Sequence, residues 1–201
     1  MRKLKLEIQT SIDGYIAQKD GDTSWMLWNW GPEWAWDEAL QAFHTKLILS
    51  SDCILLSRQM AEEGFKAHWQ SIAENKVSTQ YAFAKHVRDT HTIVFTTTLN
   101  KTIPIPGGWS NTDIVKKDIV KEINVLKAQK GKDIIVFGGA TFVSSLIENN
   151  LIDEYYLFVN PTAIGKGKPI FKGSTPLALM DAKKFECGVT VLKYKPLKTK
   201  K

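Results

Sequence analysis

The amino-acid sequence predicts an α/β fold with a largely parallel central sheet and an antiparallel C-terminal end. Short apolar runs rich in β-branched residues alternate with segments of helical spacing along the 201-residue chain. The run at residues 134–137 is uninterrupted, as expected of a strand that is covered on both faces. The last apolar segments, within residues 177–194, are predicted to form a closing pair of strands. With 43% hydrophobic residues the chain can bury a full core, and we expect one domain over residues 1–195.

The first half of the chain contains strand and helix signals in turn. Leu4–Thr10 alternates apolar and polar residues, which is typical of a strand. Pro32 is predicted to open a helix on which Trp36, Leu40 and Phe43 share one face. The next predicted elements are a strand within residues 47–56, a short helix over residues 79–86 and a strand over residues 92–97.

A second amphipathic helix is predicted after Asp118. The carboxylate of Asp118 can cap its first turn, while Ile119, Ile123 and Leu126 face the core and Gly131 provides a C-cap. Later in the chain, a strand is expected over residues 155–159, followed by a loop rich in Gly and Pro over residues 161–173.

Two glycines, Gly138 and Gly139, stand where the strand of residues 134–137 passes directly into a helix. That helix is indicated by apolar residues at helical spacing, namely Phe142, Val143, Leu146 and Ile147. Without a Cβ, the glycines leave the main chain open to a ligand, and the first amides of the helix favour an anion such as phosphate. A tight turn without a ligand uses the same pair, so both interpretations stay open.

The net charge of +6 comes mainly from the C-terminal end. Five of the 27 basic residues lie in the last nine positions, and without them 22 basic residues stand against 21 acidic ones. We interpret residues 196–201 as a solvated basic tail and expect no nucleic-acid partner.

Other classes of site and location are not indicated by the sequence. No apolar segment is long enough to span a membrane and no signal peptide is evident, so a cytoplasmic protein without a membrane partner is expected. Cys53 and Cys187 are isolated and are interpreted as buried thiols, and His68, His86 and His91 have no spacing suited to a metal. Chemistry without a metal or a protein nucleophile is consistent with hydride transfer from a cofactor.

Several motifs occur in an order that is similar to a known family. They are residues 11–17 (SIDGYIA), Gly21-Asp22, Trp25, residues 56–58 (LSR), residues 137–139 (FGG), residues 151–154 (LIDE), Pro161, Gly165, Gly167 and Phe171. With these motifs, residues 4–195 resemble the dihydrofolate reductase-like family that includes the reductase domain of the bifunctional riboflavin-biosynthesis deaminase/reductase. The resemblance implies a three-layer αβα fold with a mixed, mostly parallel sheet, NADPH across the strand ends, and a homodimer.

The resemblance also implies which residues contact the cofactor. The loop over the nicotinamide would contain Ile12, Asp13, Gly14, Ile16 and Ala17, with a plain turn at the strand end as the alternative. The pyrophosphate would be cradled by Gly138, Gly139, Ala140 and Thr141. Acids at Asp153 and Glu154 are interpreted as structural.

Arg58 would meet the adenosine 2′-phosphate, since a guanidinium fork matches phosphate oxygens. The chain departs from the family pattern nearby. Met60 stands where the Gly-Arg-x-Thr pattern has a hydroxyl, and Thr96-Thr97 stands where Ser-Arg is usual. Thr96 and Thr97 are kept as cofactor contacts, but the second basic contact is missing.

The substrate side is predicted from tryptophans and acids. Five of the seven tryptophans fall between Trp25 and Trp36, which indicates either a packed aromatic corner or a stacking wall for a flat heterocycle. Asp37, with Gln41 and His44 on the same helix face, is the predicted catalytic acid, and burial among tryptophans is expected to raise its pKa. Trp25 and Trp36 are the predicted substrate contacts. Glu38 is the alternate acid, and a solvated helix face is the alternative interpretation.

These features predict an NADPH-dependent oxidoreductase that reduces a small heterocyclic or ribosylamino-pyrimidine substrate. Lys166 and Lys168 are candidates to grip a ribose phosphate. Dihydrofolate reductase is one alternative, and a nucleotide-binding protein of this fold without turnover is another. A nucleic-acid binder that uses the basic tail is a more distant one. The sequence has no His/Cys zinc signature, so no deaminase domain is expected.

Overall fold

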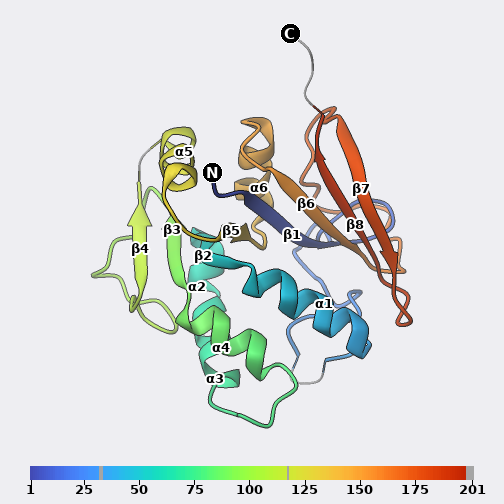
Figure 1. Ribbon diagram of the computed structural model, residues 1–201, viewed down its shortest axis with the longest axis horizontal. Helices are drawn as coiled ribbons and strands as arrows, with labels where there is room; N and C mark the ends of the chain where they lie inside the picture. Colours follow the sequence, from blue (N-terminus) through green and yellow to red (C-terminus); the bar gives the residue numbers. More distant parts are fainter. Residues whose placement is uncertain (32–33, 117, 198–201) are drawn as a thin grey trace. The chain divides into compact units, whose positions relative to one another are not determined.

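The computed structural model describes residues 1–31, 34–116 and 118–197 (Figure 1). In chain order the elements are β1 (Leu4–Thr10), α1 (Glu38–Leu49), β2 (Ser51–Ser57), α2 (Arg58–Glu62), α3 (Phe65–Ile72), α4 (Tyr81–Asp89), β3 (His91–Phe95), β4 (Thr112–Val115), α5 (Ile119–Ala128), β5 (Asp133–Val136), α6 (Ala140–Glu148), β6 (Glu154–Val159), β7 (Leu177–Lys184) and β8 (Thr190–Pro196). No helix in the described ranges is long and apolar enough to cross a membrane. The chain divides into two compact units, unit 1 (residues 1–2 and 42–139) and unit 2 (residues 3–41 and 140–201).

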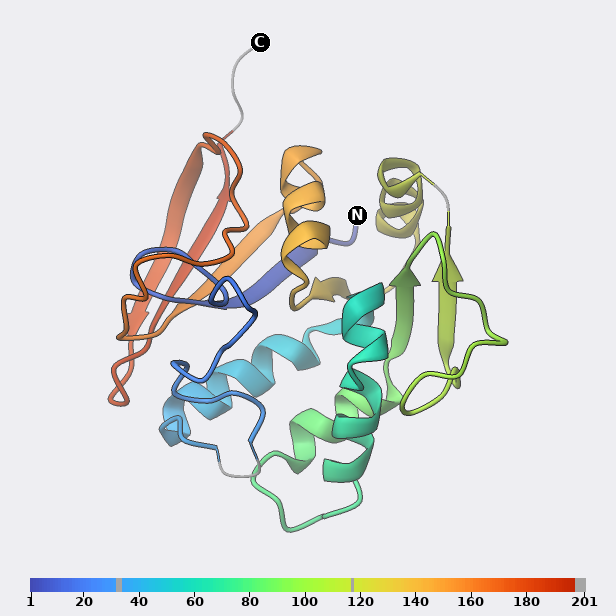
Figure 2. The same ribbon diagram turned by 180° about the vertical axis from the view of Figure 1, so that it is seen from behind.

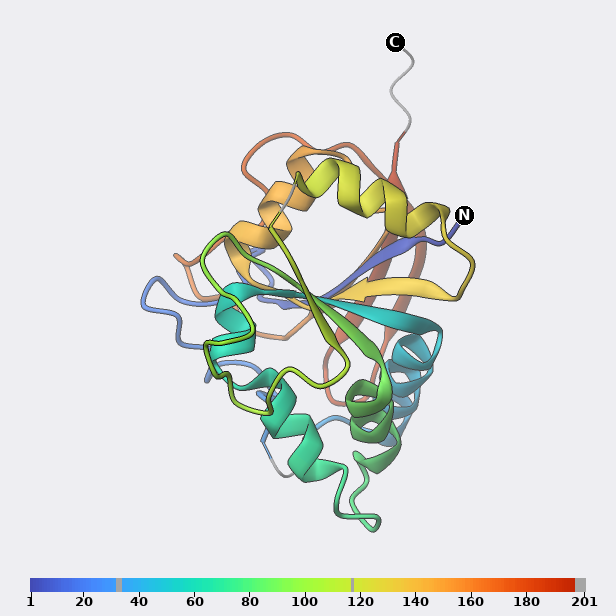
Figure 3. The ribbon, with the colours of Figure 1, turned by 90° about the vertical axis from the view of Figure 1, so that its left-hand side faces the viewer.

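The strands of unit 1 are parallel and follow the order β4-β3-β2-β5. Helix α5 lies on one face of these strands, and α3 and α4 lie on the other (Figure 3). The runs Ile54 to Leu56 in β2 and Ile134 to Val136 in β5 are fully buried. Burial on both faces explains why these strands are continuously apolar rather than alternating.

Unit 2 contains both pairing modes. Strand β1 pairs with β6 in parallel, and β8 pairs antiparallel with β6 and β7, which gives the order β1-β6-β8-β7. Helix α6 lies beside β6 (Figure 2), and the hydroxyl of Ser144 donates a 2.8 Å hydrogen bond to the carbonyl of Ile170. The predicted fold class is confirmed: mostly parallel strands, an antiparallel C-terminal pair, and helices around them.

The predicted helix start is wrong. Helix α1 begins at Glu38, so Trp36 precedes it, and Pro32 lies outside the described residues. The alternative interpretation of this helix, a solvated face with Asp37, Gln41 and His44, does not hold at His44, which is buried and stacks on Phe83 at 4.4 Å between ring centroids. The helical spacing of the apolar residues was therefore a correct signal for α1, but it did not locate its first turn.

Three elements of unit 1 were absent from the sequence prediction: α2, α3 and β4. Strand β4 has four residues and is held by pairing with β3, a long-range contact that local sequence does not encode. Helix α5 is capped by Asp118 as predicted, through hydrogen bonds from the amides of Val120 and Lys121. Its C-cap is Gln129 and not Gly131.

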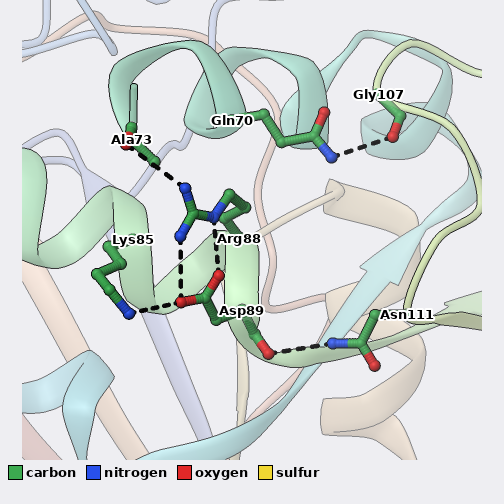
Figure 4. Close-up of polar contacts among 7 residues, drawn as sticks. All are labelled: Gln70, Ala73, Lys85, Arg88, Asp89, Gly107 and Asn111. Atoms are coloured by element: carbon green, nitrogen blue, oxygen red, sulfur yellow. Dashed lines mark hydrogen bonds and ion pairs between the residues drawn. The ribbon is translucent and has the colours of Figure 1, made fainter. Parts of the chain in front are cut away.

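An exposed polar cluster around Asp89 ties the end of α4 to its neighbours (Figure 4). The Asp89 carboxylate accepts hydrogen bonds from Arg88 and Lys85, both at 2.7 Å, and these bonds lower its pKa to about 2. Arg88 also reaches the carbonyl of Ala73 at 3.5 Å, and Asn111 donates to the main-chain carbonyl of Asp89 at 3.1 Å. The cluster fixes the turn that leads into β4.

The acids of residues 151–154 are structural, as predicted. The Asp153 carboxylate accepts a 2.7 Å hydrogen bond from the amide of Leu4. Glu154 is buried and lies 2.6 Å from the Lys3 ammonium and 3.2 Å from that of Lys193, while the Tyr156 hydroxyl donates to it at 2.8 Å. Desolvation raises the pKa of Glu154, but the hydrogen bonds from Lys3, Tyr156 and Lys193 outweigh it and lower the pKa to about 2.

Candidate functional site

The carboxyl ends of the parallel strands of unit 1 meet along one edge. Ser57 at the end of β2 is opposite Phe95 of β3, which in turn is opposite Val115 at the end of β4. Leu55 is opposite Val136, the last residue of β5. The residues that leave these strands therefore gather at one edge, which is where open α/β sheets bind ligands.

The glycine pair lies at this edge, directly after β5. Gly139 is half-buried and has a φ of 82°, a conformation that L residues rarely adopt. A Cβ built on Gly138 would meet only the Met60 sulfur, at 3.7 Å. The turn therefore keeps space beside the main chain that any larger residue would fill, and an anion such as a pyrophosphate fits that requirement.

Arg58 is the first residue of α2 and extends from the end of β2. The hydroxyl of Ser57 caps this helix by accepting a 3.2 Å hydrogen bond from the amide of Met60. The Arg58 guanidinium is half exposed and lies 3.0 Å from the Glu62 carboxylate one turn later. Its ion-pair partner is thus an exposed neighbour, which leaves the guanidinium available to a phosphate.

The two threonines after β3 have different surroundings. Thr96 is buried, and its hydroxyl accepts hydrogen bonds from the amides of Thr98 and Leu99, both at 3.1 Å. Thr97 is exposed. The hydroxyl of Thr96 is therefore used to hold the turn, whereas Thr97 can contact a ligand.

In unit 2 the loop after β1 is fastened to the loop of residues 162–165. Asp13 accepts a 2.6 Å hydrogen bond from the Ser11 hydroxyl and further bonds from the amides of Ile164 at 3.2 Å and Gly165 at 2.7 Å. These bonds, with that from Ser11 the largest, lower the pKa of Asp13. The ionised carboxylate is thus the anchor of this loop.

The same loop exposes an apolar side chain. Gly14 takes a φ of 84°, which allows the turn, and its amide donates to the Ser11 carbonyl at 3.0 Å. Ile12 is 64% exposed, whereas Ala17 is buried and Ile16 half-buried. An exposed Ile on an anchored turn is a suitable surface for a flat ring, and it costs free energy while it remains in water.

The two remaining predicted pyrophosphate contacts lie at the start of helix α6. Ala140 is the first residue of this helix, and Thr141, the second, is exposed.

The tryptophan cluster is mainly a packed corner of unit 2. Trp28, Trp34 and Trp36 are buried, and Trp36 stacks on Phe158 with 5.5 Å between ring centroids. Trp25 is half-buried, and its indole N–H is buried with no acceptor among the described residues. Of the two predicted substrate contacts, Trp25 keeps part of its ring accessible, whereas Trp36 is buried and used in packing.

Asp37 caps helix α1 and does not lie on it. Its Oδ1 accepts a 2.9 Å hydrogen bond from the amide of Leu40, and its Oδ2 accepts one of 3.0 Å from the amide of Cys187. Desolvation acts to raise its pKa, but the bonds from Cys187 and Leu40 outweigh it, so the pKa is lowered. The prediction of a raised pKa is wrong, because a carboxylate that accepts amide hydrogen bonds is stabilised in its charged form. Glu38 is exposed in the first turn of α1, where its charge favours the helix dipole.

We expect Asp37→Asn to lower stability more than it affects a reaction. The Asn amide would place a donor against one of the two N–H groups, which leaves that N–H unsatisfied at a cost of about 1–2 kcal/mol. Urea unfolding of the two proteins measures the loss. Glu38→Gln, which removes a charge without removing a cap, is the control and should change stability by about 0.5 kcal/mol or less. A variant of unchanged stability with selectively reduced turnover would restore Asp37 as a catalytic candidate.

The two cysteines differ in burial. Cys53 is buried, and desolvation raises the pKa of its thiol to about 11. Cys187 is only half-buried, so the prediction of two buried thiols is wrong for it. Among the described residues no group of three or more His, Cys, Asp or Glu side chains could hold a metal ion.

The sequence reasoning missed β4, although the short apolar pair Ile114-Val115 lies within it. It also missed the pairing of the Asp13 loop with residues 162–165, although both segments belong to the quoted motifs.

Comparison with known proteins gives the family. The model of the RibD C-terminal domain matches residues 2–192, nearly the whole chain. The chain belongs to the RibD C-terminal domain family. Among relatives of this RibD C-terminal domain protein, the uncharacterized protein YyaP of Bacillus subtilis (strain 168) is 27% identical over 197 residues, which covers 96% of this chain and 94% of YyaP.

Two solved structures share the fold of this RibD C-terminal domain. A pyrimidine reductase-like protein from Corynebacterium diphtheriae has a TM-score of 0.61 at 15% identity, covering 98% of this chain and 93% of its own. The diaminohydroxyphosphoribosylaminopyrimidine deaminase/5-amino-6-(5-phosphoribosylamino)uracil reductase from Thermotoga maritima has a TM-score of 0.62 at 16% identity, covering 98% of this chain and 57% of its own. At these identities the likeness shows the fold alone.

Proposed function

We propose that the protein is an NADPH-dependent reductase of a ribosylamino-pyrimidine or a related small heterocycle. The observation that carries this proposal is the match of the RibD C-terminal domain model to residues 2–192, together with the open glycine turn at the carboxyl edge of unit 1. The uracil reductase activity in the name of the Thermotoga maritima protein suggests the substrate class.

The residues of the chain would divide the binding work between phosphates and rings. The main chain of Gly138 and Gly139 would hold the pyrophosphate, and Arg58 would contact the 2′-phosphate. Thr97 of unit 1 offers an exposed hydroxyl for a further phosphate oxygen. When bound, the nicotinamide supplies the hydride, so the chain needs only to bind the cofactor and the substrate and to orient them.

In unit 2 the Asp13-anchored loop presents Ile12 as an apolar surface for a ring. The accessible part of the half-buried Trp25 ring can contact a flat substrate. Hydride transfer leaves a negative charge on the substrate, which must then take up a proton. Asp37 is held in its ionised form by two amide hydrogen bonds, so it has no proton to donate. We therefore assign proton delivery to water.

A second candidate is a nucleotide-binding protein of the same fold without turnover. The observation that favours it is the capping role of Asp37, which removes the first-choice acid from the chemistry. The two candidates share the cofactor site and differ in whether a substrate is reduced.

The decisive experiment measures NADPH binding by calorimetry and NADPH oxidation by absorbance. The substrates offered are 5-amino-6-(5-phosphoribosylamino)uracil and dihydrofolate. Oxidation with the pyrimidine supports the proposal, and oxidation with dihydrofolate supports dihydrofolate reductase instead. Tight binding with neither reaction supports the second candidate, and no binding of NADPH contradicts both.

Arg58→Ala should lower the affinity for NADPH about tenfold and leave that for NADH unchanged. A charge-assisted hydrogen bond contributes roughly 1.5–3 kcal/mol, and the low end applies because the guanidinium is half exposed. Lys85→Ala is a matched control, because it also removes an exposed ion pair one helical turn apart in unit 1. An equal loss for NADPH and NADH would show that Arg58 does not contact the 2′-phosphate.

A further inference from the structure

A cleft of about 380 Å³ lies at the end of β4 in unit 1, on the same edge as the glycine turn. Its lining consists of Asn100, Lys101, Ile114, Val115, Lys116 and Glu122. The volume falls in the range of small-ligand pockets, which is about 300–1,000 Å³. The lining combines apolar side chains with two ammonium groups, the chemistry that suits a nucleoside bearing a phosphate.

The two lysines differ in how they are paired. The Lys101 ammonium lies 3.5 Å from the carboxylate of Asp113, so part of its charge is already balanced. Lys116 is exposed, and its ammonium has no ion-pair partner among the described residues. An unpaired cation on the wall of a cleft is a ready ligand for an anion.

The register of the strands relates Lys116 to the residues already assigned. The amide of Thr96 donates a 3.0 Å hydrogen bond to the carbonyl of Val115, so Lys116 leaves β4 directly beside Thr96-Thr97. Arg58 leaves β2, on the other side of β3. Two strand spacings separate the main chains of Arg58 and Lys116 by roughly 10 Å. Side chains of this length reach roughly 6 Å each, so both can touch one phosphate that lies over Thr97.

We propose that Lys116 supplies the second basic contact to the adenosine 2′-phosphate, and that the cleft beside β4 receives the adenosine. This inference rests on the proposed function for the identity of the ligand. The family pattern has Ser-Arg where this chain has Thr96-Thr97, so the arginine cation of that pattern is missing. In this chain the ammonium of Lys116, at the end of the neighbouring strand β4, takes its place. Arg58 and Lys116 then lie on either side of Thr96-Thr97, the residues that leave β3.

The test uses two nucleotides that differ only in the phosphate at issue, adenosine 2′,5′-bisphosphate and adenosine 5′-monophosphate. We expect Lys116→Gln to weaken the first about tenfold and to leave the second unchanged within twofold, because one charge-assisted contact is removed. Lys130→Gln is the matched control, an exposed lysine beyond the far end of the ten-residue helix α5. It should change neither affinity.

Glu122→Gln is a variant for which we expect the opposite change in affinity. Glu122 also lines the cleft, and removing its negative charge should strengthen binding of the 2′,5′-bisphosphate. Equal affinities of wild type and Lys116→Gln for the 2′,5′-bisphosphate overturn the inference, and so does an equal loss for both nucleotides. Lys116→Gln can lose affinity for the 2′,5′-bisphosphate alone even if the wild-type protein oxidises no NADPH. That result supports the inference and contradicts the proposed reductase, so the two proposals are tested independently.

Discussion

Gly139→Ala is expected to weaken NADPH binding at least tenfold while the protein stays folded. The new methyl group would stand beside the main chain where the pyrophosphate approaches the turn between β5 and α6. Loss of one charge-assisted hydrogen bond from an amide to a phosphate, roughly 1.5–3 kcal/mol, corresponds to about tenfold or more in affinity. Calorimetric titration with NADPH measures the change.

The φ of 82° at Gly139 means that this substitution also strains the main chain, by about 1 kcal/mol. Gly108→Ala is the matched control, since Gly108 has a φ of 68° and a Cβ there would meet nothing within 4 Å. Both variants should lose similar stability in urea, and only Gly139→Ala should lose affinity. Identical NADPH affinities for the two variants would remove the glycine turn from the site.

Glu154→Gln is expected to destabilise the protein by about 2–3 kcal/mol at neutral pH. Its carboxylate is buried and joined to Lys3, Lys193 and Tyr156, and its pKa falls from 4.5 to about 2 in the folded protein. The amide of Gln cannot pair with two ammonium groups, and truncating a buried ion pair leaves charges uncompensated.

The pH dependence of this difference follows from the direction of the pKa shift. The folded pKa of Glu154 is depressed, so its stabilisation is fully present above the unfolded pKa of about 4.5 and is lost as the pH falls toward about 2. Urea unfolding of both proteins across this window should therefore show converging stabilities. Glu148→Gln, which breaks the exposed pair with Lys172, is the control and should cost less than about 1 kcal/mol. A Glu154→Gln deficit that stays constant from pH 7 to pH 2 would contradict the assignment.

Local patterns in the sequence were enough for several elements. Leu4–Thr10 forms β1 within its predicted limits because strict alternation is a period that only a strand satisfies. Asp118 caps α5 as predicted, because a carboxylate directly before an amphipathic run has its partner amides two and three residues away. The chain turns away from α6 at Asn150, which has a φ of 53°, because Asn tolerates the left-handed conformation.

Two site residues show where local patterns were insufficient. Helical spacing placed Asp37 on a helix face, but the carboxylate instead caps α1 and binds the amide of Cys187, 150 residues away in the sequence. Its pKa consequently moves in the opposite direction to that expected from burial among tryptophans. Lys116 likewise acquired a position only through the pairing of β4 with β3.

The sequence by itself determined the alternation of strands and helices, the glycine turn after β5 and the family to which the motifs belong. The alternation and the turn depend on residues close together in the chain, whose spacing and backbone preferences act locally. The family assignment depends on the order of short motifs between residues 11 and 171. The tertiary structure alone decided which polar groups are already bonded and which remain available to a ligand. Asp37 and Thr96 are occupied by amides, whereas Arg58, Thr97 and Lys116 lie along one strand edge, because hydrogen-bond partners and strand register are set by long-range pairing.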